Sequence, residues 1–368
     1  MSHHKIYRLL DATANRACEA VRVVEDIVRF VFDDHLLTKE WKEFRHHLVA
    51  SLQALPAEMR SAFRHTESDV GTAIALTSEI ERDDIADLIA ANVARLQQSL
   101  RSLEEGAKLI DDKLASQVEA LRYRSYSLAS VTQAIEESIQ RLQDVRLCVL
   151  IDGGSSEQTF SQMLDLLLSA DVGAIQLRDK KMNDAELVAR ARLLVEKSRG
   201  RPTLSIINDR PDIAVLAGAD GVHVGQTDLG VKEVRQIVGP YRVIGISTHN
   251  LEQLRRAVLD GANYAGIGPV FPSETKTFSC HGGLALIEQV ANQTALPLFA
   301  IGGIDVKNAA DVIRAGVSRL AVASAITSAV DPERVVIALK ERLNHSAVQK
   351  LQSESTSVSF SPEGTAQL

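Results

Sequence analysis

The stretch Gly221-Val-His-Val-Gly-Gln-Thr-Asp228 places a short run with two valines directly before a polar turn. The same order, an apolar run followed by polar residues or glycine, recurs along much of the chain. The eight runs are Val145–Ile151, Ala174–Leu177, Thr203–Ile207, Gly221–Val224, Val243–Ile246, Tyr264–Ile267, Leu298–Ile301 and Leu320–Val322. Runs of this length, rich in β-branched residues and bounded by turn residues, are typical of buried strands.

The segments between these runs have the apolar spacing of helices. Phe160, Leu164, Leu167 and Leu168 recur at three- and four-residue intervals, as on one face of a helix. Strands that alternate with helices favour a parallel sheet with right-handed crossovers. We therefore predict the α/β class, with a (β/α)8 TIM barrel over residues 141–345 and an active site at the carboxyl ends of its strands.

Cationic and amide side chains follow the second and third runs. Gln176, Arg178 and Lys180 occupy alternate positions at the end of the second run and just beyond it, and Asn208 follows the third. Anionic oxygens favour such hydrogen-bond donors. We expect these residues to bind small-molecule phosphorylated substrates.

Two carboxylates, Asp209 and Asp228, follow neighbouring runs. Because no cluster of Cys or His accompanies them, the pair suits a hard cation that keeps water and substrate phosphate among its ligands. The expected metal ligands are therefore Asp209 and Asp228, and the expected cofactor is Mg²⁺.

Hydroxyl and glycine residues after the later runs predict further phosphate contacts. Hydroxyls and an ammonium group can bind phosphate oxygens, a glycine pair lets backbone amides approach a ligand, and a helix amino end attracts an anion. The residues are Ser247 after the fifth run, Ser273, Thr275 and Lys276 after the sixth, Gly302-Gly303 after the seventh and Ala323-Ser324 after the eighth.

With these motifs in order, residues 145–345 resemble the thiamine phosphate synthase family. The matching motifs lie on six loops and are Gln176-Leu-Arg178-Asp-Lys180, Ile207-Asn208-Asp209-Arg210, Asp220-Gly-Val-His223-Val-Gly-Gln226-Thr-Asp228, Gly245-Ile-Ser247-Thr-His249, Gly268-Pro-Val-Phe-Pro-Ser273-Glu-Thr275-Lys276 and Ile301-Gly302-Gly303-Ile304. Each motif is weak alone, so their joint occurrence carries the resemblance. The family often has threonine where this chain has Ser273, and serine keeps the hydroxyl.

The resemblance implies a transferase that condenses 4-amino-2-methyl-5-(diphosphooxymethyl)pyrimidine with hydroxyethylthiazole phosphate, giving thiamine phosphate and pyrophosphate by Mg-assisted dissociative substitution. It implies that Arg178, Lys180, Ser247 and Lys276 are catalytic. It implies a substrate-binding set of Gln176, Leu177, Arg178, Asp179, Lys180, Asn208, Ser247, Ser273, Glu274, Thr275, Lys276, Gly302, Gly303, Ala323 and Ser324.

Structural interpretations stand beside these functional ones. Asp228 could cap a helix that begins after Leu229-Gly230, Arg178 and Asp179 could form an ion pair, and the two glycines could serve a tight turn. For His223 and His249, a packed or ligand-orienting role is favoured over a catalytic one. The joint pattern on six loops favours a binding site.

Two other functions also remain open. A thiazole tautomerase-like barrel would share the fold and the thiazole phosphate pocket, and a non-enzymatic binding protein for thiamine intermediates would share the cavity. A tautomerase need not keep the diphosphate and magnesium residues. The synthase is favoured because all of them are present: Arg178, Lys180, Asp209, Asp228 and Lys276.

Residues 1–140 are predicted to form a separate, mostly α-helical domain. Between Leu55 and Gly153 the only proline or glycine residues are Pro56, Gly71 and Gly106. Ile85–Ile110 and Leu114–Leu142 are long amphipathic stretches, which indicates helices.

A charged motif occurs twice in this part of the chain, at a separation of 79 residues. Arg22 with Glu25, and Arg101 with Glu104, are i,i+3 pairs on one helical face. Two interpretations are open: a duplicated salt-bridged helix pair without chemistry, or a polar, anion-binding cleft. The corresponding residues are Arg16, Arg22, Glu25 and Asp26 in the first copy and Arg95, Arg101, Glu104 and Glu105 in the second.

This part also resembles a domain found ahead of thiamine phosphate synthases and regarded as an alternative hydroxymethylpyrimidine phosphate kinase. The resemblance implies a second, kinase activity as a hypothesis. No Gly-x-x-x-x-Gly-Lys-Ser/Thr loop is present, so ATP would be held in another way. The match rests on Leu10-Asp11-Ala12, Asn15-Arg16, Glu19, Arg22-Val-Val-Glu25-Asp26, Arg45-His46, Asp69-Val70-Gly71, Asn92 and Leu103-Glu104-Glu105.

Composition narrows the class further. The chain has 368 residues, enough for two domains, and its formal net charge of −7 disfavours a nucleic-acid partner. Its three cysteines show neither metal nor disulfide spacing. Without a signal peptide or an apolar run long enough to span a bilayer, we expect a cytoplasmic enzyme with no membrane partner. Residues 346–368 are rich in Ser, Thr, Gln and Glu and are predicted to be a disordered tail; the oligomeric state is left open.

Overall fold

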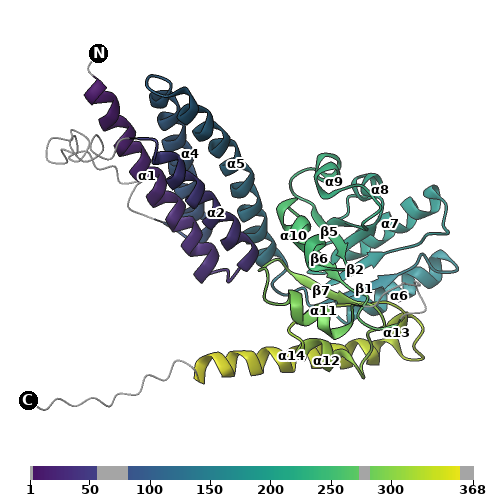
Figure 1. Ribbon diagram of the computed structural model, residues 1–368. Coiled ribbons are helices and arrows are strands. Elements are labelled where there is room, and N and C mark those ends of the chain that lie inside the picture. The colour runs from purple at the N-terminus through teal and green to yellow at the C-terminus, as the bar shows by residue number, and fades with distance from the viewer. Residues whose placement is uncertain (1–2, 56–81, 273–281, 357–368) are drawn as a thin grey trace, which may run out of the picture. The chain divides into compact units, whose positions relative to one another are not determined.

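Eight parallel strands of the computed structural model close into a barrel in sequence order (Figure 1). The predicted TIM barrel is confirmed. Five strands have the predicted bounds, whereas β1 begins two residues later, β3 includes Asn208 and β5 continues to Thr248. The strands are β1 (Leu147–Ile151), β2 (Ala174–Leu177), β3 (Leu204–Asn208), β4 (Gly221–Val224), β5 (Val243–Thr248), β6 (Tyr264–Ile267), β7 (Leu298–Ile301) and β8 (Leu320–Val322).

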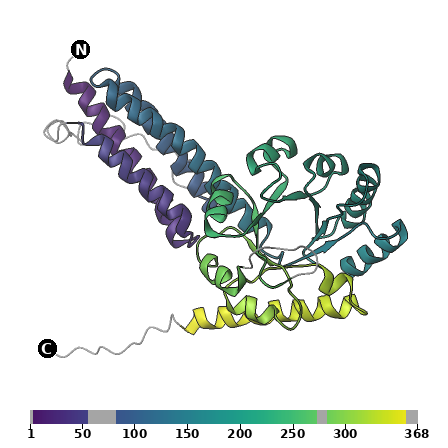
Figure 2. The same cartoon turned by 45° about the vertical axis from the view of Figure 1, so that its right-hand side comes forward.

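Helices follow the strands and surround the barrel (Figure 2). A capping box at Ser156 fixes the start of the first of them, α6, and its buried face is the one predicted from the apolar spacing. The helices are α6 (Glu157–Ser169), α7 (Asp184–Ser198), α8 (Pro211–Ala217), α9 (Val231–Val238), α10 (Leu251–Leu259), α11 (Gly283–Val290), α12 (Ala309–Arg314), α13 (Ser324–Thr327) and α14 (Pro332–Thr356).

The structure describes residues 3–55, 82–272 and 282–356. The chain divides into two compact units, one of residues 1–137 with 292–295 and one of residues 138–291 with 296–368. We find no helix in the described part of the chain whose length and hydropathy would let it span a bilayer.

The end of the barrel unit differs from the sequence analysis. A disordered tail is predicted from residue 346, whereas α14 continues to Thr356. Ala347, Gln349, Lys350 and Leu351 are good helix formers, and they continue the helix. The remainder of the predicted tail, residues 357–368, lies outside the described residues.

Apolar side chains fill the barrel interior. They come from the first or middle residues of their strands, together with Leu142 and Val145 just before β1. Polar residues can therefore occupy the carboxyl ends of the strands. The cluster consists of Leu142, Val145, Cys148, Ala174, Ile206, Val243, Tyr264, Phe299 and Ala321.

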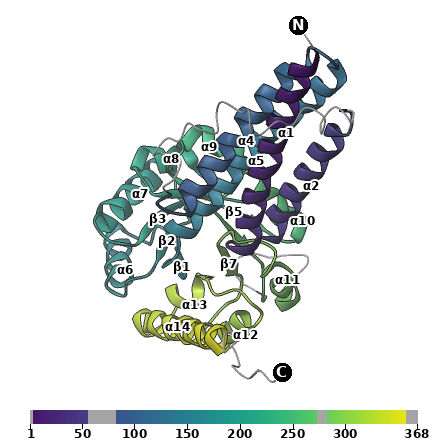
Figure 3. The same ribbon diagram turned by 90° about the vertical axis from the view of Figure 1, so that its left-hand side faces the viewer.

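The other unit is helical, as predicted (Figure 3). Its described helices are α1 (His3–Phe30), α2 (His35–Leu52), α4 (Ile85–Ala107) and α5 (Asp112–Arg141). Helix α1 packs against both α2 and α4. Asp34 caps α2 through a hydrogen bond from the Leu37 amide of 2.7 Å, and Asp111 accepts from the Leu114 amide at 3.1 Å in the first turn of α5.

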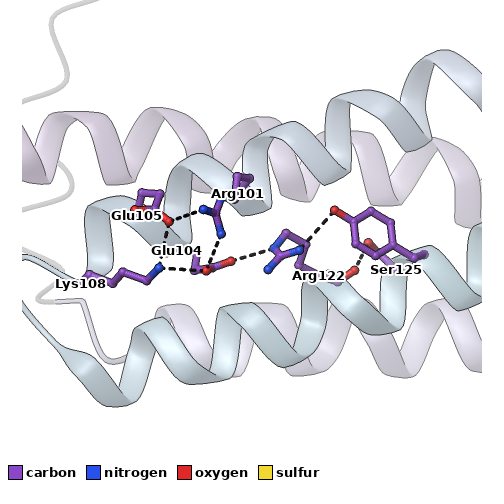
Figure 4. A network of polar contacts seen from close by, with 7 residues as sticks. Arg101, Glu104, Glu105, Lys108, Arg122 and Ser125 are labelled. Carbon is purple, nitrogen blue, oxygen red and sulfur yellow. Dashed lines mark hydrogen bonds and ion pairs between the residues drawn. The ribbon is translucent and has the colours of Figure 1, made fainter.

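A buried carboxylate organises the α4–α5 half of this unit (Figure 4). Glu104 is 1% exposed and accepts a hydrogen bond of 2.7 Å from Arg122 Nε and one of 2.9 Å from Arg101 Nη1. Burial alone would raise the pKa of Glu104, but the hydrogen bonds from Arg122 and Lys108, together with the charges of Arg122 and Arg101, lower it. Glu104 is therefore fully paired with cations.

The α1–α2 half repeats this arrangement. Glu25 is 2% exposed, accepts a hydrogen bond of 2.5 Å from Arg45 Nε on α2, and lies 3.7 Å from Arg22 Nη1. The charged motif that the sequence repeats is therefore also repeated in the structure. In each copy, an arginine from the following helix pairs with the buried glutamate. Its buried carboxylates support the interpretation as a salt-bridged scaffold.

Glu104→Gln is expected to destabilise the helical unit by about 3 kcal/mol or more, because it leaves the buried Arg122 without a charged partner. Since the folded state lowers the Glu104 pKa, this stabilisation is present above the unfolded pKa of about 4.3 and is lost as the pH falls through the folded value. Urea unfolding of the full chain, followed by circular dichroism, measures the loss.

Glu105→Gln is the matched control, because the neighbouring side chain is 50% exposed. It is expected to cost no more than about 0.5 kcal/mol. Equal losses from the two substitutions would contradict the assignment of Glu104 as the organising charge.

Candidate active site

A cavity of about 490 Å³ lies at the carboxyl ends of the barrel strands. It collects side chains that are far apart in the sequence. Of the predicted site residues, those that line it are Gln176, Arg178, Asn208, Ser247, Gly302, Gly303, Ala323 and Ser324. Convergent polar groups in one strand-end cavity are the expected form of a small-molecule site in this fold.

Two neighbouring strands hold an amide pair at the cavity wall. Gln176 on β2 is 3% exposed, and its Nε2 donates a hydrogen bond of 3.1 Å to Asn208 Oδ1 on β3. Because the Asn208 oxygen is occupied in this way, its NH₂ group is the part that can donate to a ligand. Arg178 follows β2 directly, and its backbone N–H donates to Ile151 O at 2.8 Å.

Three described residues of the predicted substrate-binding set do not line the cavity: Leu177, Asp179 and Lys180. Leu177 is 1% exposed and packs in the barrel wall. Asp179 accepts hydrogen bonds from the backbone amides of Gly153, Lys181 and Met182. The bond from Gly153 ties the loop after β2 to the loop after β1, so Asp179 supports the loop that carries Arg178 rather than pairing with Arg178.

Asp209 sits at a backbone position that few residues adopt. Its φ is 61°, and its amide donates a hydrogen bond of 2.7 Å to His223 O. Lys180 Nζ lies 3.3 Å from Asp209 Oδ2. Burial raises the pKa of Asp209, the neighbouring Asp228 carboxylate adds to that rise, and Lys180 opposes it. The two carboxylates predicted as metal ligands are therefore close enough to interact.

Asp228 does not cap the following helix. Helix α9 begins at Val231 with Gly230 as its N-cap and has no side-chain cap, so the capping alternative is wrong. Asp228 Oδ2 instead accepts a hydrogen bond of 2.7 Å from the Gly225 amide. That bond turns the carboxylate back toward the end of β4.

The pair fits a magnesium ion by its chemistry. Among the residues that the structure describes, no group of three or more His, Cys, Asp or Glu side chains could enclose a metal. Two carboxylates suit Mg²⁺, which keeps several waters and commonly binds through one or two carboxylates together with substrate phosphates. Asp209 and Asp228 would hold it there.

The glycine pair after β7 brings two loops together. Gly303 has φ 60°, and a Cβ atom there would lie 2.3 Å from Pro272 O. A side chain would therefore push the loop after β6 away from the loop after β7. The remaining predicted residues, Ser273, Glu274, Thr275 and Lys276, lie outside the described residues.

Two histidines lie at the cavity, as the sequence analysis expected. His249 Nδ1 contacts Gly268 O, and His223 lies between Ser247 and Tyr264 within hydrogen-bond distance of both. Tyr264 was not singled out, because in sequence it is one residue of an apolar run. Only its pairing with Gly245 on β5 reveals its position.

The fold and the cavity define a (β/α)8-barrel enzyme whose strand-end site offers cations, amides, a hydroxyl and two carboxylates. A family model described as thiamine monophosphate synthase matches residues 147–326, and a model described as ThiD2 family matches residues 8–131.

Proteins that align with almost the whole length of this chain indicate the same family. A thiamine-phosphate synthase of Rhodopirellula baltica is 40% identical over 330 residues, covering 87% of this chain and 88% of the relative. One of Thermosynechococcus vestitus is 36% identical over 342 residues, covering 92% and 95%. The solved structure of thiamine phosphate pyrophosphorylase from Pyrococcus furiosus is 28% identical with a TM-score of 0.50, covering 56% of this chain and 98% of that one. The chain belongs to the thiamine-phosphate synthase family.

Asp209→Asn is expected to raise the melting temperature of the metal-free chain and to abolish the rise that Mg²⁺ gives the wild type. The substitution removes one of two neighbouring negative charges, and asparagine tolerates a positive φ. The lost ion pair with Lys180 matters little because that lysine is 61% exposed. Thermal unfolding with and without Mg²⁺ measures both effects.

Asp165→Asn removes an exposed carboxylate of α6 and serves as the control. It should leave the Mg²⁺-dependent shift unchanged. A shift that survives in Asp209→Asn would argue against Asp209 as a metal ligand.

Proposed function

We propose that the barrel condenses 4-amino-2-methyl-5-(diphosphooxymethyl)pyrimidine with hydroxyethylthiazole phosphate to give thiamine phosphate and pyrophosphate. The observation that carries the proposal is the convergence of Gln176, Arg178, Asn208, Ser247 and Gly303 on one cavity. Membership of the thiamine-phosphate synthase family supports the same reaction.

In this proposal the bond between the pyrimidine methylene carbon and the diphosphate oxygen breaks, and pyrophosphate leaves with the electron pair. The thiazole nitrogen then forms the new bond to the same carbon. Arg178 and Lys180 stabilise the negative charge that develops on the leaving group. The amides of Gln176 and Asn208 orient the pyrimidine diphosphate, so that the reacting atoms are already aligned.

Mg²⁺, held by Asp209 and Asp228, would add positive charge at the diphosphate. Gly302 and Gly303 after β7, together with Ala323 and Ser324 directly after β8, would hold the thiazole phosphate. Ser273, Glu274, Thr275 and Lys276 complete the proposed substrate set, with Lys276 as a further cation for the leaving group.

Arg178→Ala is expected to lower the rate of pyrophosphate release by about 10²-fold, because it removes one donor that stabilises the leaving group. The assay mixes the full chain with both purified substrates and Mg²⁺ and follows pyrophosphate. Arg192→Ala, on the exposed face of α7, is the matched control and should keep wild-type activity.

The same assay separates the alternatives. A thiazole tautomerase would change thiazole phosphate alone and release no pyrophosphate, whereas a binding protein would take up both ligands without turnover. Wild-type chain that binds both substrates but releases no pyrophosphate would overturn the synthase proposal.

We also propose a second activity for the helical unit, the ATP-dependent phosphorylation of hydroxymethylpyrimidine phosphate. The match to the ThiD2 family over residues 8–131 supports it. Transfer of a phosphoryl group needs cations around the phosphates. The Arg22 and Arg101 side chains are 51% and 55% exposed, so their outer faces are accessible to a phosphate.

Arg22→Ala and Arg101→Ala are each expected to lower ATP-dependent phosphorylation by about tenfold or more, since each removes one cation from the transferred group. The full chain is incubated with ATP, Mg²⁺ and hydroxymethylpyrimidine phosphate, and the diphosphate is quantified. Lys42→Ala, an exposed cation of α2, is the control. If neither the wild type nor the control forms diphosphate, the helical unit is a scaffold and the kinase proposal fails.

A further inference from the structure

Three side chains form a hydrogen-bonded row from the barrel interior to the cavity. The Tyr264 hydroxyl on β6 lies 3.0 Å from His223 Nδ1 on β4, and His223 Nε2 lies 2.9 Å from Ser247 Oγ on β5. Tyr264 and His223 are 6% and 8% exposed. Ser247 is half-buried and lines the cavity, so the row ends where a ligand would bind.

The strand register leaves room for this row. Gly245 on β5 pairs with His223 on one side and with Tyr264 on the other. A Cβ atom at Gly245 would lie 2.0 Å from Tyr264 Cζ, so only glycine lets the ring reach across β5. Phe299 holds the other side of that ring edge-to-face, with centroids 5.3 Å apart. The phenol therefore has one packed position.

Hydrogen-bond chemistry sets the direction of the row. Burial raises the pKa of Tyr264, so its hydroxyl keeps its proton. Within the described residues His223 is the only hydrogen-bond partner of that hydroxyl. A buried donor without an acceptor is costly, so Tyr264 donates to His223 Nδ1.

His223 then sets the direction of its hydrogen bond with Ser247. Because Nδ1 accepts the phenol proton, that nitrogen carries no proton of its own, and the imidazole is in its neutral form. A neutral imidazole that accepts at Nδ1 carries its proton on Nε2. That N–H donates to Ser247 Oγ, and the serine proton is then directed away from His223, into the cavity.

We propose that Tyr264 is a positioning residue that acts through His223 to make the Ser247 hydroxyl a hydrogen-bond donor to the substrate. The inference rests on the proposed function, because the leaving diphosphate accepts hydrogen bonds and cannot donate to a serine oxygen. Without the phenol, His223 can carry its proton on Nδ1 and accept the serine proton itself. Ser247 would then present lone pairs to a negatively charged group.

Tyr264→Phe keeps the ring and removes only the hydroxyl. In the full chain we expect kcat to fall about tenfold, the effect of one correctly oriented hydrogen bond, while KM changes less than about twofold. Tyr241→Phe makes the same change at a residue that is 86% exposed and should have no effect. Wild-type kcat for Tyr264→Phe would overturn the proposal.

A double substitution distinguishes a positioning role of Tyr264 from a packing role. In Ser247→Ala chain, which lacks the hydroxyl that Tyr264 is proposed to orient, Tyr264→Phe should cause no further loss of kcat. An equal loss in both backgrounds would show that the phenol acts independently of Ser247, and would overturn the proposal.

The tautomer of His223 can be measured without any turnover. In chain labelled with ¹⁵N-histidine, NMR should show the Nε2–H tautomer in the wild type and a shift toward Nδ1–H in Tyr264→Phe. The Nδ1–H form in the wild type would refute the inference. This result stands even if no pyrophosphate is released, so failure of the proposed function and failure of the positioning role are distinguishable.

Discussion

Closure of eight short parallel strands into a barrel is the constraint on which the site depends. Each strand is hydrogen-bonded to two neighbours, so the register at each pair fixes which side chains meet at the rim. Gln176, Asn208 and Ser247 reach one cavity because they stand at or near the carboxyl ends of β2, β3 and β5. These donors come from three strands, so no single loop has to supply them all.

The sequence predicted the fold well because runs of apolar residues indicate directly which segments are buried. Five strands have the predicted bounds, and in β3 and β5 polar residues continue the strand beyond the predicted end. Ser247 and Thr248 remain in β5 because they pair with Gly266 and Ile267 of β6, although their side chains are polar. Hydropathy cannot detect this extension, since backbone pairing depends on the neighbouring strand and not on the side chain.

The same limit explains what was missed at the candidate site. Asp228 resembled a helix cap by its place in the sequence, but its carboxylate turns back to the Gly225 amide. Tyr264 resembled core, and only register places it beside His223. In the helical unit the repeat at 79 residues was visible, whereas Arg45 and Arg122, which lie 77 residues apart on the following helices, were not paired with it. Local spacing finds contacts within a helix and misses those between helices.

The carboxylates of the two units differ in how far neighbouring cations compensate them, and this contrast distinguishes a structural ion pair from a candidate binding site. Glu25 and Glu104 each form ion pairs with cations of their own unit, so their negative charges are compensated within the fold. At the barrel rim, Asp209 and Asp228 lie close together with Lys180 as the cation beside Asp209 in the described structure, and the pKa of Asp209 is raised rather than lowered. Two neighbouring carboxylates, one of them on Asp209 at a φ of 61°, are unfavourable for folding, as is typical of functional sites. Two carboxylates beside one lysine leave an excess of negative charge at the barrel rim, and this excess is the feature that supports the proposed Mg²⁺.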